Sequence, residues 1–410
     1  MSEKVAVIGM GYVGLPLALA MTAAGKEVTG IDTNGFRIAE LSEGRSFTED
    51  VKEAALKKAM NHGLSFSTDY RTISSCEVIV ICVPTPLSPN NQEPDLESVL
   101  QAVRSVALRV TNRALVVIES TVSPGTTEGC ILNEFSAAGK ILDEDFLLGF
   151  SPERVNPGPG GLQLEEIPKL TSGVSDASAD RCYLFYSSFL NVAVRVNGTR
   201  EAEFAKLLEN SYRLVNIALV NELALAAFHM GIDFEEVVNA AATKPYGFQA
   251  FYSSAGAGGH CIPVDPVYLN SQILLETGSS SAMLEVAIEK NNSMPEEILN
   301  LVKSVCPDLS GRQILVAGVS YKPGVSDVRN SPALKVIAQL IEEGANVSFY
   351  DPLVEEIYAG NTALKSSLLA PSTSDFDLVV ALHSIGEAQL ETFRVSGAKI
   401  LNLWQRFEAR

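Results

Sequence analysis

Cysteine and histidine are scarce in this sequence. Among 410 residues there are six cysteines, none in a CxxC spacing, and four histidines. This distribution argues against a disulfide scaffold, a zinc site and a His-rich metal centre, so we expect no bound metal. Cysteines without a disulfide pattern are typical of a reducing compartment, which favours the cytoplasm.

Positive charge is also in short supply. Lys and Arg number 31 against 49 for Asp and Glu, giving a formal net charge of −18. A chain this acidic repels phosphate backbones and anionic lipid, so we expect neither a nucleic-acid partner nor a membrane-surface role. Any anionic ligand must therefore be held by a local site.

The one long uncharged segment is not a continuous apolar run. The chain carries no charge from Val5 to Gly25, but three glycines and Pro16 interrupt this segment. A short buried strand, a glycine turn and a helix explain it better than a signal peptide or a membrane span.

The composition that is present indicates a globular chain. Hydrophobic residues make up 46% and charged residues 20%, and the length suits two or three domains. In the first half, β-branched runs alternate with helical patterns such as Leu96–Leu108, which indicates a parallel sheet buried on both faces. The strands expected there are Val5–Ile8, Glu27–Ile31, Glu77–Cys82, Ala114–Ile118 and Phe146–Phe150.

The middle and the end of the chain complete the expected architecture. A helical pattern without Gly or Pro runs from Thr199 to Met230, and helical sequence continues over 266–305. Strands return at Gln313–Ala317, Ala345–Tyr350, Asp377–Leu382 and Lys399–Leu403. We predict an α/β fold of two Rossmann-like doubly wound domains, 1–198 and 306–410, joined by a helical domain, 199–305. Its long central helix is expected to form a subunit interface in at least a homodimer.

A glycine-rich turn follows the first expected strand. Gly9, Gly11 and Gly14 fit GxGxxG before a helix, and the next strand ends in Asp32. This context favours a dinucleotide site, and the Asp32 carboxylate favours NAD over NADP; the alternative is a glycine turn in another doubly wound protein. The residues Ile314–Gly318 resemble Val5–Gly9, but the three-glycine turn is missing there. We therefore expect this second occurrence of the pattern to bind a different ligand.

Cys261 stands in a loop rich in glycine, next to His260 and just before a helical segment. Backbone amides and a helix N-terminus favour the thiolate, and the small neighbours let a substrate carbon approach. The residues alone leave a catalytic nucleophile and a structural loop cysteine equally open.

Lys206 and Asn210 share one face of the long helix, because they are four residues apart. An ammonium and an amide side by side would stabilise a developing oxyanion. A solvated helix surface is the commoner meaning of these residue types.

Three further segments follow strands, where ligands of such folds bind, although ordinary turns explain them equally well. They are Glu119–Gly125, Ser151–Arg154, and Tyr321–Pro323 with Asp327 and Arg329.

Taken together, these motifs resemble the UDP-glucose/GDP-mannose dehydrogenase family. The resemblance extends in order from Lys4 to about Asp351. It is carried by GxGYVGLP with Asp32, Cys82–Pro86, Glu119–Thr121, Ser151–Arg154, Lys206 with Asn210, Gly258–Pro266 and Tyr321–Pro323.

The resemblance implies a four-electron oxidation of a nucleotide sugar at C6 with two NAD molecules. It implies that Cys261 is the nucleophile of a thiohemiacetal and a thioester, and that Lys206 and Asn210 stabilise the C6 oxygen. Glu153 would be the general base toward the hydrolytic water, positioned by Thr121 and Asp265.

The resemblance also implies the binding residues. Those for NAD are Gly9, Gly11, Tyr12, Val13, Gly14, Asp32, Arg37, Pro84, Thr85, Thr121 and Arg329. Those for the UDP-sugar are Glu153, Arg154, Val155, Lys206, Asn210, Phe251, Tyr252, Gly258 and Lys322.

The sugar and the reaction have alternatives. Ser151–Arg154, Thr243–Phe248 and His260 resemble the branch acting on UDP-N-acetylmannosamine or UDP-N-acetylglucosamine, with UDP-glucose the alternative. A two-electron NAD dehydrogenase with a structural Cys261, or a silent NAD-binding sensor or scaffold, would share this layout. The sequence departs from the branch at Ser253–Gly256, where Pro-Gly-Pro-Gly is usual, and at Asn330, where Glu is usual.

Overall fold

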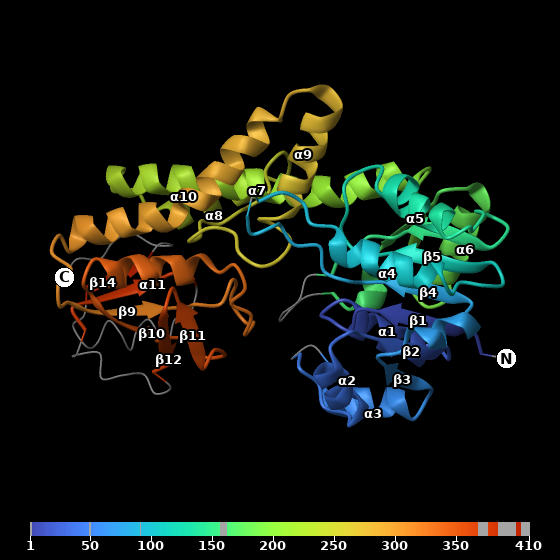
Figure 1. The fold of residues 1–410 in the computed structure, drawn as a ribbon. Coiled ribbons are helices and arrows are strands. Elements are labelled where there is room, and N and C mark those ends of the chain that lie inside the picture. The colour runs from blue at the N-terminus through green and yellow to red at the C-terminus, as the bar shows by residue number, and fades with distance from the viewer. Residues whose placement is uncertain are drawn as a thin grey trace. The chain divides into compact units, whose positions relative to one another are not determined.

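The structure is a computed structural model that describes residues 2–48, 51–90, 92–155, 162–367, 376–383 and 399–402 (Figure 1). It separates into two compact units. The first is Met1–Glu209 with Ser271–Glu276, and the second is Asn210–Asn270 with Thr277–Arg410. The division into three domains remains a prediction.

The first unit is built on an eight-stranded sheet with the order β3-β2-β1-β4-β5-β6-β7-β8. Its strands are β1 (Lys4–Ile8), β2 (Glu27–Ile31), β3 (Leu64–Ser67), β4 (Val78–Ile81), β5 (Ala114–Ile118), β6 (Phe146–Phe150), β7 (Lys169–Gly173) and β8 (Ala193–Arg195). The five predicted strands are confirmed. The expectation of a parallel sheet needs one correction, because β7 runs antiparallel to β6 and β8 then pairs parallel to β7.

Helices flank this sheet and bury both of its faces. They are α1 (Gly14–Ala23), α2 (Gly35–Ser42), α3 (Glu53–Met60), α4 (Glu97–Ala107), α5 (Leu132–Ala137) and α6 (Asp176–Ser187), with short turns at Tyr70–Ser75, Thr127–Ile131 and Leu164–Glu166. Alternate residues of β1 enter different apolar clusters, Val5 and Val7 one and Ala6 and Ile8 the other. The period of two therefore places a core on each side of the sheet.

The second unit carries helices and a smaller parallel sheet of order β10-β9-β13-β14. Its elements are α8 (Phe234–Ala242), α9 (Asp265–Thr277, of which 271–276 belong to the first unit), α10 (Ala282–Val305), β9 (Gln313–Ala317), α11 (Pro332–Glu342), β10 (Asn346–Tyr350), the hairpin β11 (Glu356–Ala359) and β12 (Thr362–Lys365), β13 (Leu378–Ala381) and β14 (Lys399–Asn402). The four strands predicted here are confirmed, apart from Leu403, which lies outside the described residues. The hairpin was not predicted.

The long helix α7 (Thr199–Met230) has the predicted bounds. Its length and a mean hydropathy of 1.2 over its most apolar window would allow a membrane span by composition, and 22% of that window is buried. Its buried residues are nevertheless partly polar, since they include Glu203, Lys206, Asn210, Ser211 and Asn221 beside apolar residues such as Leu207 and Leu214. Its exposed apolar residues are Phe204, Leu208, Tyr212, Leu219, Leu223 and Met230. Polar groups on the inward face indicate a helix packed within protein rather than in lipid.

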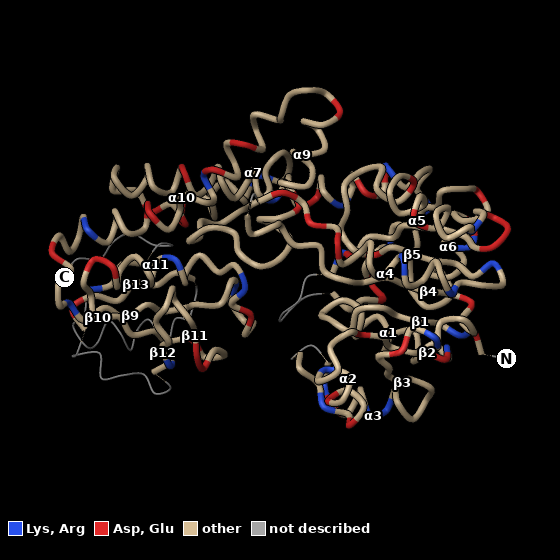
Figure 2. Tube along the Cα trace, viewed as in Figure 1, with Lys and Arg blue, Asp and Glu red and all other residues tan. Residues whose placement is uncertain are grey.

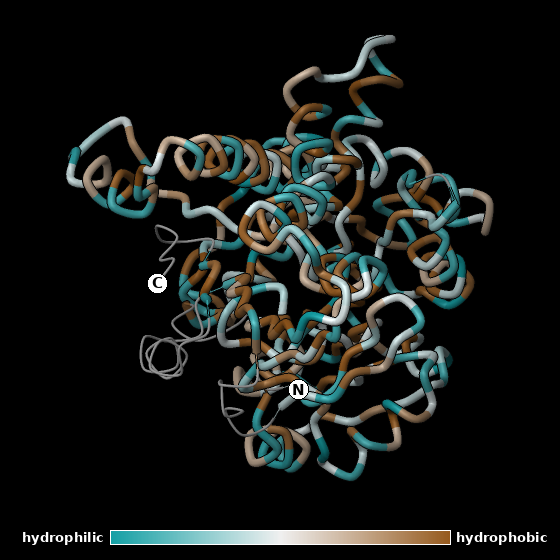
Figure 3. The backbone as a smooth tube through the Cα atoms, turned by 90° about the vertical axis from the view of Figure 1, so that its left-hand side faces the viewer, coloured by the Kyte–Doolittle hydropathy of each residue, from teal (hydrophilic) through white to brown (hydrophobic). Residues whose placement is uncertain are grey.

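Neither charge of one sign nor hydrophobicity is concentrated in one part of the described chain. In the described residues Lys and Arg are interspersed with Asp and Glu, without a continuous basic stretch (Figure 2). Hydrophobic and hydrophilic segments also alternate along the backbone (Figure 3). An anionic ligand must therefore be bound by local groups, as the composition predicts.

Candidate active site

The glycine turn after β1 has the geometry of a dinucleotide cradle. Gly9 has φ +96°, and a Cβ there would lie 2.6 Å from the Cys82 carbonyl oxygen. A Cβ on Gly14, the first residue of α1, would lie 2.0 Å from the Gly9 carbonyl oxygen. A Cβ on Gly11 would instead meet open space. The turn is closed toward the protein and open at the helix N-terminus, so it fits the pyrophosphate of NAD.

The next strand, β2, presents Asp32 beside this turn. Its Oδ2 accepts a hydrogen bond of 2.9 Å from the Met10 amide and one of 3.0 Å from Arg37 Nη1. The Arg37 guanidinium lies 4.9 Å from the centre of the Phe47 ring. Phe47 also contacts Tyr12, with ring centres 6.0 Å apart. Sequence reasoning did not single out Phe47, because an isolated aromatic residue in a loop carries no periodic signal.

The loops after β4 and β5 are joined by hydrogen bonds. Ser120 Oγ donates to the Val83 carbonyl at 2.7 Å. This bond ties the loop that carries exposed Pro84 and buried Thr85 to the loop that carries half-buried Thr121. Burial, followed by the nearby Glu119 carboxylate, raises the pKa of the Cys82 thiol well above its usual value. This thiol therefore stays protonated at neutral pH.

The loop after β5 begins with a residue of a buried ion pair. Glu119 Oε2 accepts from Lys169 Nζ of β7 at 2.8 Å, with both side chains at least 95% buried. The Tyr186 hydroxyl of α6 donates to Glu119 Oε1. Because β7 was not predicted, neither was this pairing. The sequence signal was a carboxylate placed directly after the apolar run of β5.

The residues after Thr121 are held by Glu203 of α7. Fully buried Glu203 accepts hydrogen bonds from the Gly125 amide at 2.6 Å and from the Thr127 amide at 2.9 Å. Burial raises the pKa of Glu203 to about 7, against the opposing effect of these hydrogen bonds. Sequence reasoning missed Glu203, since a Glu on a helix is usually solvated.

The loop after β6 approaches the same helix. Lys206 Nζ lies 4.0 Å from Glu153 Oε2, and Glu153 Oε1 accepts from the Val155 amide. Arg154 donates to Glu209 of α7 through two nitrogens, at 2.6 and 3.2 Å. Lys206 is 5% exposed, which excludes the alternative of a solvated helix surface for this residue.

In the second unit, Asn210 lies beside the start of α9. Asn210 Nδ2 donates to Asp265 Oδ2 at 2.6 Å, and both residues are buried. The Cys261 carbonyl accepts from the Val264 amide at 3.1 Å and the Asp265 amide at 2.8 Å. The predicted nucleophile, water-positioning carboxylate and oxyanion donor are thereby joined, with half-buried Cys261 at the N-terminal end of α9.

Two aromatic residues predicted to contact the substrate lie in the segment that leads to this loop. Half-buried Phe251 packs edge-on against Tyr212 of α7, with ring centres 5.9 Å apart. The hydroxyl of exposed Tyr252 donates to Asn239 Oδ1 of α8 at 2.9 Å. The two side chains thus pack on different helices.

The Cys261 loop packs closely on the segment that follows β9. A Cβ on Gly258 would lie 2.8 Å from the Asn330 carbonyl oxygen and 2.9 Å from Tyr321 Cβ. Arg329 pairs with Asp327 of the same segment at 2.6 Å. Arg329, predicted to contact the cofactor, thus belongs to the second unit, and whether it reaches NAD remains a prediction.

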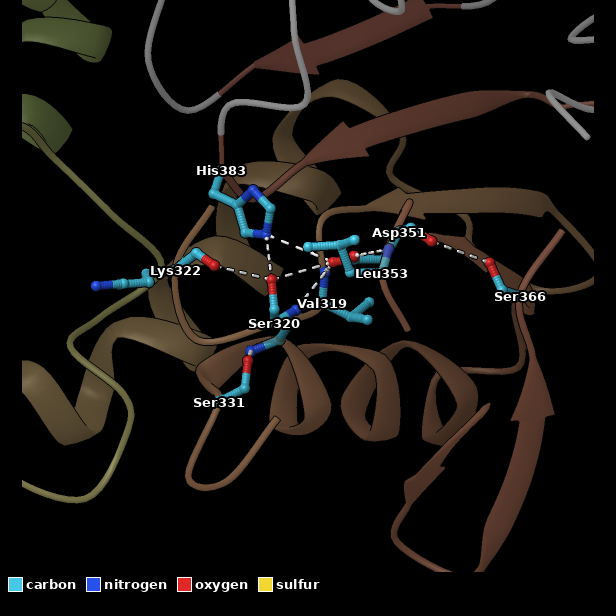
Figure 4. A network of polar contacts seen from close by, with 9 residues as sticks. Val319, Ser320, Lys322, Ser331, Asp351, Leu353, Ser366 and His383 are labelled. Carbon is cyan, nitrogen blue, oxygen red and sulfur yellow. Dashed lines mark hydrogen bonds and ion pairs between the residues drawn. The ribbon is translucent and has the colours of Figure 1, made fainter. Parts of the chain in front are cut away.

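The same segment presents Lys322, whose backbone belongs to a buried polar network (Figure 4). Ser320 Oγ lies 3.0 Å from the Lys322 carbonyl oxygen, 3.2 Å from Asp351 Oδ2 and 3.1 Å from His383 Nε2. Burial alone would raise the pKa of Asp351, but hydrogen bonds from His383 and from backbone amides hold it below its usual value. Asp351 is therefore an anion that anchors the start of the segment.

The sequence matches three domain families in order. Residues 3–189 match the UDP-glucose/GDP-mannose dehydrogenase family, NAD binding domain. Residues 200–293 match the central domain of that family, and residues 315–393 match its UDP binding domain. The three matches cover most of the chain.

Individual proteins are similar over nearly the whole length. UDP-N-acetyl-D-glucosamine 6-dehydrogenase from Pseudomonas aeruginosa is 37% identical over 359 residues, covering 86% of this chain and 83% of that protein. The structure of UDP-D-ManNAc dehydrogenase from Pyrococcus horikoshii has a TM-score of 0.85 at 31% identity, covering 97% of this chain and 94% of that one. A UDP-glucose dehydrogenase from Pyrobaculum islandicum has a TM-score of 0.86 at 26% identity, with coverages of 98% and 94%.

Proposed function

We propose that this chain, which belongs to the UDP-glucose/GDP-mannose dehydrogenase family, oxidises the C6 hydroxyl of a UDP-N-acetylhexosamine to a carboxylate through a covalent Cys261 intermediate. Its membership makes it an NAD-dependent oxidoreductase. The observation that carries the proposal is the junction of Asn210, Asp265 and the Cys261 backbone at the start of α9. Bound NAD would supply the hydride acceptor for both oxidations.

Lys206 and Asn210 would stabilise the oxygen at C6. An asparagine amide has two N–H donors, so Asn210 can donate one to Asp265 and keep the other for a substrate oxygen. Lys206 is buried beside Glu153, where its charge is less screened than on a surface. Both groups would favour the alkoxide of the first oxidation and the oxyanion formed when the thiolate adds to the aldehyde.

Cys261 makes the second oxidation possible. Its thiolate adds to the aldehyde carbon to give a thiohemiacetal. The thiohemiacetal has a carbinol group, which the aldehyde lacks, so its carbon can lose a hydride as an alcohol does. Oxidation of that carbinol gives a thioester. Glu153 would take a proton from the water that attacks the thioester, with Thr121 and Asp265 orienting it, and the uronate leaves with the thiol restored.

The substrate class rests on two supports. The family match includes a UDP binding domain, and a relative named for UDP-N-acetylglucosamine shares 37% identity. In the second unit, Lys322, Phe251 and Tyr252 are our candidates for the UDP-sugar. UDP-glucose is the second candidate, because a protein named as a UDP-glucose dehydrogenase has a similar fold.

We also infer a homodimer. The exposed apolar residues of α7 recur every four or seven positions, from Phe204 to Met230, on the side opposite its buried polar residues. Such a stripe is suited to burial against a second copy. We assign the protein to the cytoplasm on its cysteine usage.

The decisive experiment counts NADH formed per nucleotide sugar consumed, with UDP-N-acetylmannosamine, UDP-N-acetylglucosamine and UDP-glucose run to completion. Two NADH per sugar with one of the first two supports the proposal. Cys261→Ser should then abolish uronate formation. One NADH per sugar, with Cys261→Ser still active, would replace the proposal by a two-electron dehydrogenase.

A further inference from the structure

The loop that leads into Cys261 has little rigidity of its own. Residues 253–259, which we call the approach loop, are all Ser, Ala or Gly. Glycine-rich and serine-rich segments populate many backbone conformations. Gly256 and Gly259 both have positive φ, +115° and +79°. Something outside the loop must therefore select one conformation.

Side-chain amides of three asparagines bind the backbone of this loop. Asn221 Oδ1, from α7, accepts from the Ser254 amide at 2.7 Å. Asn330 Nδ2, from the segment before α11, donates to the Gly259 carbonyl at 3.1 Å.

The third asparagine, Asn291 of α10, binds one residue through both of its polar atoms. Its Oδ1 accepts from the Ala257 amide at 2.6 Å, and its Nδ2 donates to the Ala257 carbonyl at 3.1 Å. Three separate elements thus bind the backbone of one short loop at three different residues.

The burial of two of these amides shows that their hydrogen bonds matter energetically. Asn221 is 1% and Asn291 is 7% exposed, and a buried polar group without a partner is costly. Asn330 is exposed, but its φ of +51° is a conformation that asparagine adopts more readily than most residues. The approach loop also packs closely against the backbone of Asn330, since a Cβ on Gly258 would be 2.8 Å from the Asn330 carbonyl oxygen.

We propose that Asn221, Asn291 and Asn330 are positioning residues that hold the approach loop so that the Cys261 thiol captures the aldehyde before it escapes. This inference rests on the proposed function. A thiol held within bonding distance gains the rate advantage of a fixed approach, and a displacement of about 1 Å costs on the order of 100-fold. If the loop is loosened, part of the aldehyde should therefore leave the enzyme before the second oxidation.

The expected signature is a change in stoichiometry. Each aldehyde that leaves has lost one hydride, so it accounts for one NADH instead of two. We expect Asn291→Ser and Asn330→Gly to move the NADH formed per sugar from two toward one, with the missing product recovered as aldehyde trapped by hydroxylamine. Asn330→Gly keeps the positive φ and removes only the amide.

A second readout requires no turnover. The rate at which iodoacetamide alkylates Cys261 in the full-length protein, followed on its peptide by mass spectrometry, should change severalfold in both variants. Asn292→Ser is the matched control, because Asn292 is the exposed neighbour of Asn291 on α10. It should leave both the stoichiometry and the alkylation rate as they are in the wild type.

The outcomes separate the two ideas. If the wild type forms two NADH per sugar and both variants do so too, with unchanged alkylation and only a lower Tm, the asparagines are merely structural and the inference is overturned. If the wild type fails to form two NADH, the proposed function fails. The alkylation rates then decide whether the amides hold the loop, and unchanged rates would reject that as well.

Discussion

Replacing Glu203 by Gln removes a buried carboxyl whose titration should be visible in the stability of the protein. Burial raises its pKa from 4.5 to about 7, despite the amides of Gly125 and Thr127 that donate to it. One pKa unit corresponds to about 1.4 kcal/mol, so this group changes the free energy of unfolding by about 3 kcal/mol. The charges nearby are Glu128, which raises the pKa further, and Arg200.

The sign follows from proton binding. Between pH 4.5 and 7 the folded protein holds the Glu203 proton more tightly than the unfolded chain does. The stabilisation from this proton is complete below pH 4.5 and is lost as the pH rises through about 7. The stability of the wild type relative to Glu203→Gln should therefore fall by about 1.4 kcal/mol per pH unit in this range and level off above it. The amide costs one hydrogen bond at every pH, which shifts the difference curve without changing its slope.

Urea unfolding followed by circular dichroism from pH 5 to 8 measures this difference. Glu201→Gln is the matched control, because Glu201 is an exposed carboxylate on the same helix. A flat curve for Glu203→Gln would refute the reasoning. It would mean that the two amide hydrogen bonds outweigh burial and that Glu203 is ionised throughout, as a surface carboxylate would be.

Four further predictions test the first unit. Gly11→Ala should weaken NAD binding, measured by calorimetry, by roughly tenfold or more without lowering Tm, because its Cβ enters open space where the pyrophosphate would lie. Gly14→Ala should also lower Tm, since its Cβ would lie 2.0 Å from a backbone oxygen. Asp32→Asn should reduce the preference for NAD over NADP in parallel titrations, by removing the charge that repels a 2′-phosphate. Lys169→Met should cost about 3–5 kcal/mol in urea unfolding by leaving Glu119 charged and buried, and Glu119→Gln in the same chain should restore most of it.

The strands and the cofactor turn were predictable because their signals are local. The apolar run of β1, the three glycines and Asp32 lie within one short stretch, and α7 is a helix without Gly or Pro. The strand β7 was missed because Lys169 and Ser172 interrupt its apolar pattern. Both are buried, Lys169 by an ion pair with Glu119, fifty positions earlier in the chain.

Polar residues on helices were the harder problem. The pattern that places Lys206 and Asn210 on one face cannot tell a buried face from a solvated one, and the structure buries both. Glu203, Asn221 and Asn291 carry the same ambiguity, because their partners are backbone groups far away in the sequence. Only tertiary packing reveals that these side chains replace water as hydrogen-bond partners.

The turns that follow β1 and β9 show how similar backbone geometry can serve two kinds of ligand. Gly9 donates its amide to Ile31 at 2.7 Å, and Gly318 donates to Tyr350 at 2.8 Å, each beside an aspartate that ends the next strand. The first turn leads directly into α1, whose N-terminal amides suit a pyrophosphate.

The second turn leads elsewhere, although it begins in the same way. After Gly318 the helix α11 begins only at Pro332, and the His383 ring fills the space beside the turn, 2.7 Å from where a Cβ on Gly318 would lie. The intervening segment carries Lys322 in place of a helix N-terminus. A phosphate here must therefore be bound by a side-chain cation such as Lys322, which is why we assign the nucleotide sugar to the turn after β9 and NAD to the turn after β1.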